Sequence, residues 1–155
     1  MKRKQRLCFA ASSGGHFEQL MMLKALMKKY NSTLITEKTK YKISTHGIKT
    51  YYMLQVNREE PFCYFKLFVN AIRSLKILLI ENPDVIVCTG VLAMIPLCLL
   101  SKLFGKKLIY IESFAKITSP TKSGKLLYKY ADQFYIQWPE MKAFYPNAIY
   151  LGGIY

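Results

Sequence analysis

The chain has 155 residues, 52% of them hydrophobic and 21% charged, which suffices for one folded domain and excludes a disordered protein. Its formal net charge of +14 predicts an anionic partner, either a nucleic acid or an anionic membrane surface. Lysine and arginine residues are interspersed in the apolar helices, and no RNP or zinc-finger motif is present. We therefore expect the partner to be a membrane surface and not a nucleic acid. A solvated basic face without a partner is the simpler alternative.

Strands and helices alternate along the chain. Apolar or β-branched runs predict strands at residues 6–11, 32–36, 48–54, 85–88, 108–111, 134–136 and 148–151. Apolar residues at helical spacing predict helices at residues 17–30, 61–81, 91–104 and 123–131.

This order predicts the fold class. Repeated strand–helix–strand units form a parallel sheet with helices on both faces, so we expect an α/β, Rossmann-like fold in one domain over residues 1–155. Ligands of such sheets bind beyond the carboxyl ends of the strands. Polar groups that follow four strands should meet there, namely Ser12 to His16, Thr89 with Gly90, Glu112 with Ser113, and residues 137–140.

The segment 7–19, L-C-F-A-A-S-S-G-G-H-F-E-Q, places a strand, a tight glycine turn and a helix N-terminus in succession. Unpaired backbone N–H groups and the helix dipole suit such a terminus to phosphate, with side-chain donors from Ser12, Ser13 and His16. The alternative is that Gly14 and Gly15 only let the chain turn, because the spacing matches neither a Walker loop nor the dinucleotide fingerprint.

Two segments bear on membrane attachment. The apolar run at residues 85–100 is broken by a Thr-Gly pair and a proline, so a strand, a turn and a helix explain it better than a bilayer span. The predicted helix 61–81 mixes large apolar residues with Lys66, Arg73 and Lys76, which suits docking among lipid headgroups. The alternative is that it packs on the sheet and extends its cations into water.

The cysteines Cys8, Cys63, Cys88 and Cys98 lie in apolar runs without a CxxC pair or nearby histidines. This pattern indicates buried, reduced thiols, so we expect no metal site.

Four blocks, in order, carry a family likeness. S-S-G-G-H-F-E-Q-L, I-Y-I-E-S-F-A-K, G-K-L-L-Y and A-D-Q-F-Y-I-Q-W-P-E together resemble the asparagine-linked glycosylation protein fourteen family, over nearly the whole chain. The likeness is greatest to bacterial members encoded for capsule and exopolysaccharide synthesis.

The resemblance implies the N-terminal, acceptor half of a GT-B glycosyltransferase that is split into two polypeptides. Such a membrane-associated subunit recruits a catalytic, nucleotide-sugar-binding subunit like asparagine-linked glycosylation protein thirteen. The UDP-sugar would be bound mainly by that partner, so no cofactor is expected in this chain. The acceptor would be a sugar linked to a polyprenyl diphosphate.

The resemblance and the fold together assign site residues. Those expected to bind the acceptor diphosphate or sugar are Ser12, Ser13, Gly14, Gly15, Thr89, Gly90 and Ser113. Ile154 and Tyr155 would contact the partner. The implied location is the cytoplasmic face of the plasma membrane. Attachment would be peripheral or through one internal apolar segment, because the N-terminal spanning helix of eukaryotic members is lacking.

Sugar transfer needs a base for the acceptor hydroxyl and stabilisation of the leaving diphosphate. His16 suits either task, since histidine exchanges a proton near neutral pH, and Glu112 could act as the base or orient a sugar hydroxyl. The alternatives are a helix-capping histidine and a carboxylate held by backbone amides. The rival function is a stand-alone nucleotide-sugar- or phosphate-binding enzyme that uses the glycine turn as its anion loop.

Overall fold

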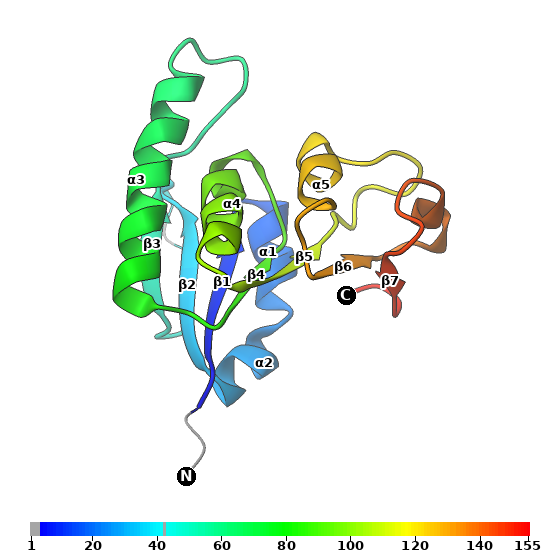
Figure 1. The fold of residues 1–155 in the computed structure, drawn as a ribbon, viewed down its shortest axis with the longest axis horizontal. Coiled ribbons are helices and arrows are strands. Elements are labelled where there is room, and N and C mark those ends of the chain that lie inside the picture. Colours follow the sequence, from blue (N-terminus) through cyan, green and yellow to red (C-terminus); the bar gives the residue numbers. More distant parts are fainter. Residues whose placement is uncertain (1–3, 42) are drawn as a thin grey trace.

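The computed structural model describes residues 4–41 and 43–155, which are organised around one parallel sheet (Figure 1). Its strands are β1 (Arg6–Ala11), β2 (Asn31–Glu37), β3 (Lys49–Met53), β4 (Val85–Cys88), β5 (Lys107–Ile111), β6 (Gln133–Ile136) and β7 (Ile149–Tyr150). They pair in the order β3-β2-β1-β4-β5-β6-β7. The predicted α/β class is confirmed, and each predicted strand agrees to within about one residue at either end.

Helices cover both faces of the sheet. α1 (Gly15–Met21) and α2 (Lys24–Lys29) lie on one face, and α3 (Cys63–Glu81), α4 (Ile95–Leu103) and α5 (Lys122–Leu127) lie on the other (Figure 1). Short 3₁₀ helices, η1 (Leu92–Met94) and η2 (Pro139–Ala143), follow β4 and β6. Successive side chains of β1 point to opposite faces, so Phe9 packs under α1 and α2 while Cys8 and Ala10 pack in the other core. Burial on both faces explains why the strands are apolar throughout.

The prediction of one helix over residues 17–30 is wrong. The segment forms α1 and α2, which are separated at Met22 and Leu23. Neither glycine nor proline marks this break, so the helical periodicity runs across it without a signal. Leu20 of α1 and Met27 of α2 are buried in the same core, so both helices pack on one face of the sheet despite the break.

The apolar run at residues 85–100 is β4, η1 and the first part of α4. The predicted helix 91–104 therefore begins as η1, and Pro96 lies in the first turn of α4, where its missing N–H is tolerated. In the described ranges, no helix combines the length and the apolar character that crossing a bilayer requires.

Helix α3 is anchored along one side. The buried Asn70 donates to the carbonyl of Leu54 (2.9 Å) and accepts from its N–H (2.8 Å). In the last turn, Glu81 accepts from Lys49 Nζ (2.6 Å) and the Tyr51 hydroxyl (2.5 Å). The solvent side carries exposed apolar residues at helical spacing, which we call the α3 stripe: Phe65, Phe68, Ile72, Leu75 and Leu79.

All four cysteines are free and buried, as expected. Burial raises the pKa of the Cys8 thiol to about 12, so this thiol stays protonated at neutral pH.

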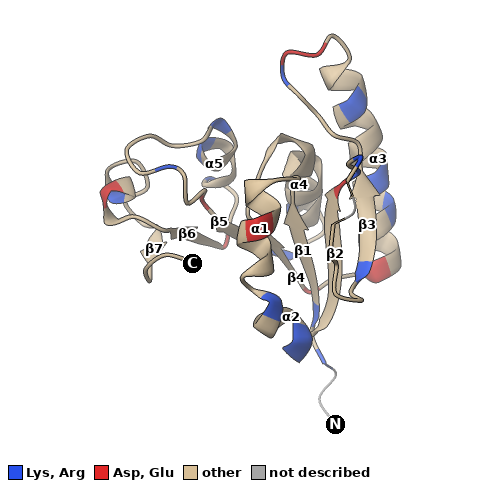
Figure 2. Cartoon of the chain, turned by 180° about the vertical axis from the view of Figure 1, so that it is seen from behind, with Lys and Arg blue, Asp and Glu red and all other residues tan. Residues whose placement is uncertain are grey.

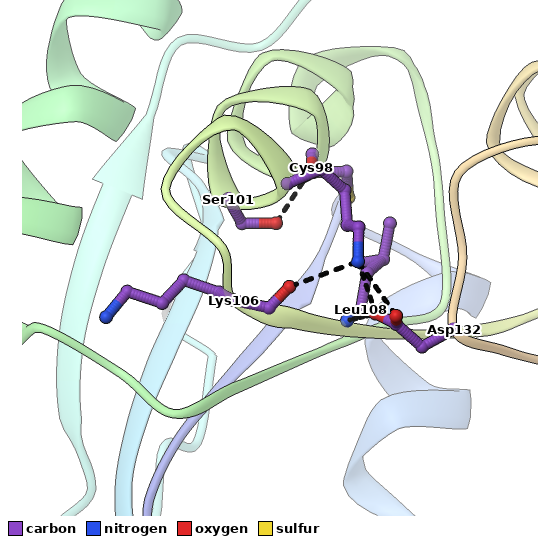
Figure 3. A network of polar contacts seen from close by, with 6 residues as sticks. Cys98, Ser101, Lys106, Leu108 and Asp132 are labelled. Atoms are coloured by element: carbon purple, nitrogen blue, oxygen red, sulfur yellow. Dashed lines mark hydrogen bonds and ion pairs between the residues drawn. The ribbon is translucent and has the colours of Figure 1, made fainter.

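Lys102 ties α4 to the amino ends of β5 and β6, and Figure 3 labels the residues around it, among them Lys106, Leu108 and Asp132. Lys102 Nζ lies 2.7 Å from Asp132 Oδ2, which also accepts from the Leu108 N–H at 2.7 Å. Burial raises the pKa of Asp132, but the hydrogen bonds from Lys102 and Leu108 outweigh it and hold the pKa below its ordinary value.

Replacing Asp132 by Asn should lower the unfolding free energy by about 1 kcal/mol or less at neutral pH, because the pair is partly solvent-exposed. A depressed carboxyl pKa contributes stability above the ordinary aspartate pKa, about 3.9, and this contribution is lost as pH falls through the folded-state pKa. Urea unfolding of both proteins between about pH 7 and about pH 3 should show the difference shrinking on acidification. The exposed Glu140→Gln is the control, and a pH-independent difference for Asp132→Asn would contradict the assignment.

Candidate functional site

The connections from β1 and β4 leave in opposite directions across the sheet, which opens a crevice at their carboxyl ends. There the Ser12 N–H donates to the Gly90 carbonyl at 2.8 Å and joins the two loops. A cleft of about 800 Å³, here called the polar cleft, lies at this edge. Its lining includes Ser12, Ser13, His16, Glu37, Val56, Arg58, Glu60, Lys116, Thr121 and Lys122.

His16 lines the polar cleft from the first turn of α1. Its Nδ1 lies 2.8 Å from the carbonyl of Thr89, whose hydroxyl donates to the His16 carbonyl at 2.8 Å. Because a carbonyl only accepts, Nδ1 carries the proton of this bond and Nε2 is the nitrogen left to take up another. The structure thus brings together two residues that the sequence placed at the same rim.

A buried carboxylate that the sequence analysis missed borders the glycine turn. Glu37, at the end of β2, is only 4% exposed. Ser13 donates to its Oε2 through both the backbone N–H (2.9 Å) and the hydroxyl (2.8 Å), and the Val56 N–H donates to Oε1 (3.3 Å). Both donors of Ser13 are therefore engaged within the protein, and a phosphate at the turn would face a negative charge.

Two glycines shape the same corner. Gly14 precedes α1 with a φ of 77°, and its carbonyl accepts from the N–H of Phe17 at 2.9 Å. Gly90 has a φ of 111°, and a Cβ there would lie 3.2 Å from Nδ1 of His16. A side chain at Gly90 would therefore disturb the imidazole. Around Gly15, in contrast, an added Cβ would meet no described atom within 4 Å beyond its chain neighbours and the backbone of its own helix.

Glu112 is 1% exposed and lies behind the cleft wall. Its Oε1 accepts from the Ser113 N–H (2.9 Å) and the Thr121 hydroxyl (2.9 Å), and its Oε2 accepts from the Tyr145 hydroxyl (2.7 Å). Burial, and then the hydrogen bond to Glu112, raises the pKa of Tyr145. The carboxylate thus fixes the loop between β5 and α5, of which Ser113 is a buried member.

The backbone of Glu112 joins two further loops. Its carbonyl accepts from Gln19 Nε2 at 3.2 Å and from Gln137 Nε2 at 2.8 Å, so residues after β1, β5 and β6 meet as the topology predicted. The sequence did not reveal Arg58, Lys116 and Lys122 as site residues, because only the folded chain determines which residues lie beside their loops. Glu37 could have been predicted as a site residue, because it ends a strand at the same edge of the sheet as His16.

The C-terminal tail folds back over the end of β6. The Ile154 N–H donates to Gln137 Oε1 at 2.9 Å, and the Tyr155 ring contacts the Phe114 ring edge-on at 4.9 Å. Ile154 also lines an apolar groove of about 320 Å³ on the face that carries α1 and α2. Other apolar residues of this groove are Leu23, Leu26, Ile109, Ile111 and Leu151.

Gly124 should tolerate no side chain. An added Cβ would lie 2.1 Å from Glu112 Oε2 and 2.6 Å from the Tyr145 hydroxyl. We expect Gly124→Ala to destabilise the protein by about 2 kcal/mol or more in urea unfolding, despite the better helix propensity of alanine. Gly15→Ala, at an open position, is the control. Equal stability of the two variants would contradict the tight packing around Glu112.

The strand order and the position of the cleft at the switch point define a Rossmann-like fold. Solved GT-B glycosyltransferases and UDP-N-acetylglucosamine 2-epimerases contain a domain of this fold. A crystal structure of Acinetobacter baumannii MurG superposes with a TM-score of 0.73 at 14% identity and covers 88% of this chain, which spans 42% of MurG.

The sequence comparison narrows the class to a family. A family model described as "Oligosaccharide biosynthesis protein Alg14 like" matches residues 7–154, and the chain belongs to this family. The human UDP-N-acetylglucosamine transferase subunit ALG14 is 26% identical over 173 aligned positions, 93% of this chain and 80% of the human one. The subunit of the same name from Yarrowia lipolytica is 30% identical over 172 aligned positions, which cover 95% of this chain and 80% of the Yarrowia protein. The family read from the sequence blocks is confirmed, while the greater likeness to bacterial members stays a prediction.

Proposed function

We propose that this chain is the acceptor-side subunit of a two-component glycosyltransferase that extends a polyprenyl-diphosphate-linked sugar. A separate catalytic subunit binds the nucleotide sugar, and the pathway is assembly of a capsular polysaccharide, an exopolysaccharide or another lipid-linked oligosaccharide. Family membership and the subunit names of the relatives support this proposal. The observation that carries it is the polar cleft at the switch point, with a fixed histidine on its wall.

In this mechanism His16 accepts the proton of the acceptor hydroxyl on Nε2. The hydroxyl oxygen then bonds to the anomeric carbon of the donor sugar, and UDP leaves with the electron pair of the broken C–O bond. The Thr89 carbonyl, 2.8 Å from Nδ1, orients the ring and stabilises the imidazolium that forms. Glu112 acts as a positioning residue, since it holds the loop that includes Ser113. The loops at Ser12, Gly14, Gly15 and Gly90 shape the acceptor site.

Assay of the purified chain alone, its co-expressed partner alone and both together should show transfer from UDP-N-acetylglucosamine to a lipid-linked acceptor only for the pair. In the pair, His16→Ala should lower the rate by about 100-fold without loss of co-purification, because only the base is removed. The surface His46→Ala, whose ring contacts Lys24, is the matched control. Turnover by the isolated chain would favour the stand-alone enzyme, and a wild-type rate for His16→Ala would remove His16 from the mechanism.

We further propose that Ile154 and Tyr155 form part of the partner interface, together with the adjoining apolar groove. The tail is held by Gln137 and Phe114, yet Tyr155 is 61% exposed and Leu151 is 80% exposed. Such residues offer apolar area to a partner without further rearrangement. In the two-subunit preparation, a chain without Ile154 and Tyr155 should lose co-purification, whereas His16→Ala should retain it.

We propose peripheral attachment to the cytoplasmic face of the plasma membrane, and the α3 stripe supports the contact with a lipid surface. Helical spacing places Lys76 at one edge of the stripe, beside Phe65, and Arg73 and Lys66 further round the helix on that side. Apolar groups can then enter the lipid while these cations remain near phosphates. Figure 2 shows these cations along α3, on the opposite face of the sheet from those of α2.

Reversing Lys66, Arg73 and Lys76 to Glu should release the protein from phosphatidylserine vesicles. Each cation near such a surface contributes about 1 kcal/mol, so the loss should be about 100-fold or more in a sedimentation assay. Reversal of Lys24, Lys28 and Lys29 in α2 changes the net charge equally and should have a much smaller effect. If both triple variants lose binding alike, only the net charge matters and α3 is not the docking face.

A further inference from the structure

Three cations line the polar cleft: Arg58 from the loop before α3, Lys116 from the loop after β5, and Lys122 at the start of α5. Within residues 4–41 and 43–155 none of the three forms an ion pair, since the pairs there involve Lys49, Lys66 and Lys102. We call these three residues the cationic wall. Its charge is left for something outside the chain.

The carboxylates of the same cleft are already engaged. Glu60 pairs with Lys66, and Glu37 accepts hydrogen bonds from Ser13 and the Val56 N–H. Because Glu37 borders the glycine turn, the cleft has an electrostatic direction, negative beside His16 and positive at the cationic wall.

We propose that the cationic wall binds the diphosphate of the lipid-linked acceptor, with the sugar directed toward His16 and Glu37; this assignment rests on the proposed function. A diphosphate offers several charged acceptor oxygens, which a guanidinium can bind through two parallel hydrogen bonds and lysines through single ones. Sugar hydroxyls are neutral donors, which suit a carboxylate acceptor. The glycine turn thus shapes the sugar end of the site, rather than binding the phosphates as the sequence suggested.

The cationic wall is joined through Arg58 to the loop that leads into α3, the proposed membrane-docking helix. Arg58 lies in the loop that leads to Phe62 and Phe65, which are 67% and 65% exposed. Figure 1 shows this loop and the loop before α5 at the same end of the sheet. A polyprenyl chain leaving a diphosphate held there meets exposed aromatic side chains at once, as a substrate embedded in a bilayer requires.

The test uses the full chain without its partner and measures binding of farnesyl diphosphate and, separately, UDP by calorimetry. Arg58→Gln, Lys116→Gln and Lys122→Gln are combined in one variant. The control variant combines Lys28→Gln, Lys29→Gln and Lys125→Gln, which are exposed lysines outside the cleft lining and remove the same charge. Thermal unfolding of both variants verifies that the fold is retained.

Farnesyl diphosphate should bind the wild-type and control chains with the same affinity, and its affinity for the cleft variant should be lower by about tenfold or more. Equal affinity for all three chains would overturn the cationic wall. UDP binding that is tighter than that of farnesyl diphosphate and is lost in the cleft variant would assign the wall to a nucleotide instead. The binding experiment measures no turnover, so it is independent of the transfer assay. If the transfer assay fails but farnesyl diphosphate still binds at the cationic wall, only the proposed function is refuted.

Discussion

Two carboxylates, Glu112 and Glu37, are buried at the carboxyl edge of the sheet, and the shape of that edge depends on them. An ionised carboxylate removed from water is strongly destabilising unless its oxygens accept hydrogen bonds. The donors here come from loops without regular structure, from Thr121 and Tyr145 for Glu112 and from Ser13 for Glu37. Each carboxylate therefore fixes loops that strand packing alone would leave unconstrained. The walls of the polar cleft follow from this requirement.

The three surfaces that could bind other molecules lie on different sides of the protein. The solvent side of α3 is apolar with flanking cations, the sheet face beside α1 and α2 carries the apolar groove, and the polar cleft lies at the edge between them. In the function that we propose, membrane, partner and acceptor thus approach without competing for the same surface. A lipid-linked substrate can remain in the bilayer while its head group occupies the cleft.

The strands were predictable because buried parallel strands are uninterrupted apolar runs, and His16 and Thr89 were predictable because such strands align their carboxyl ends. The break between α1 and α2 was not, since Met22 and Leu23 carry no helix-breaking chemistry. The backbone amide of Ser113 on Glu112 matches the alternative of a carboxylate held by backbone amides. The side-chain donors Thr121 and Tyr145 were hidden, because the two loops that carry them approach Glu112 only in the folded chain. Arg58 and Lys116 looked like ordinary loop cations for the same reason.

The α3 stripe has a colloidal consequence. Large apolar side chains in one row make a surface on which two copies can associate in water, and the mutual repulsion of highly basic molecules opposes that contact. Concentrated salt screens the repulsion within a few ångströms, yet it leaves the apolar attraction intact. The protein should therefore precipitate as ionic strength rises, and a mild detergent that coats α3 should keep it dispersed.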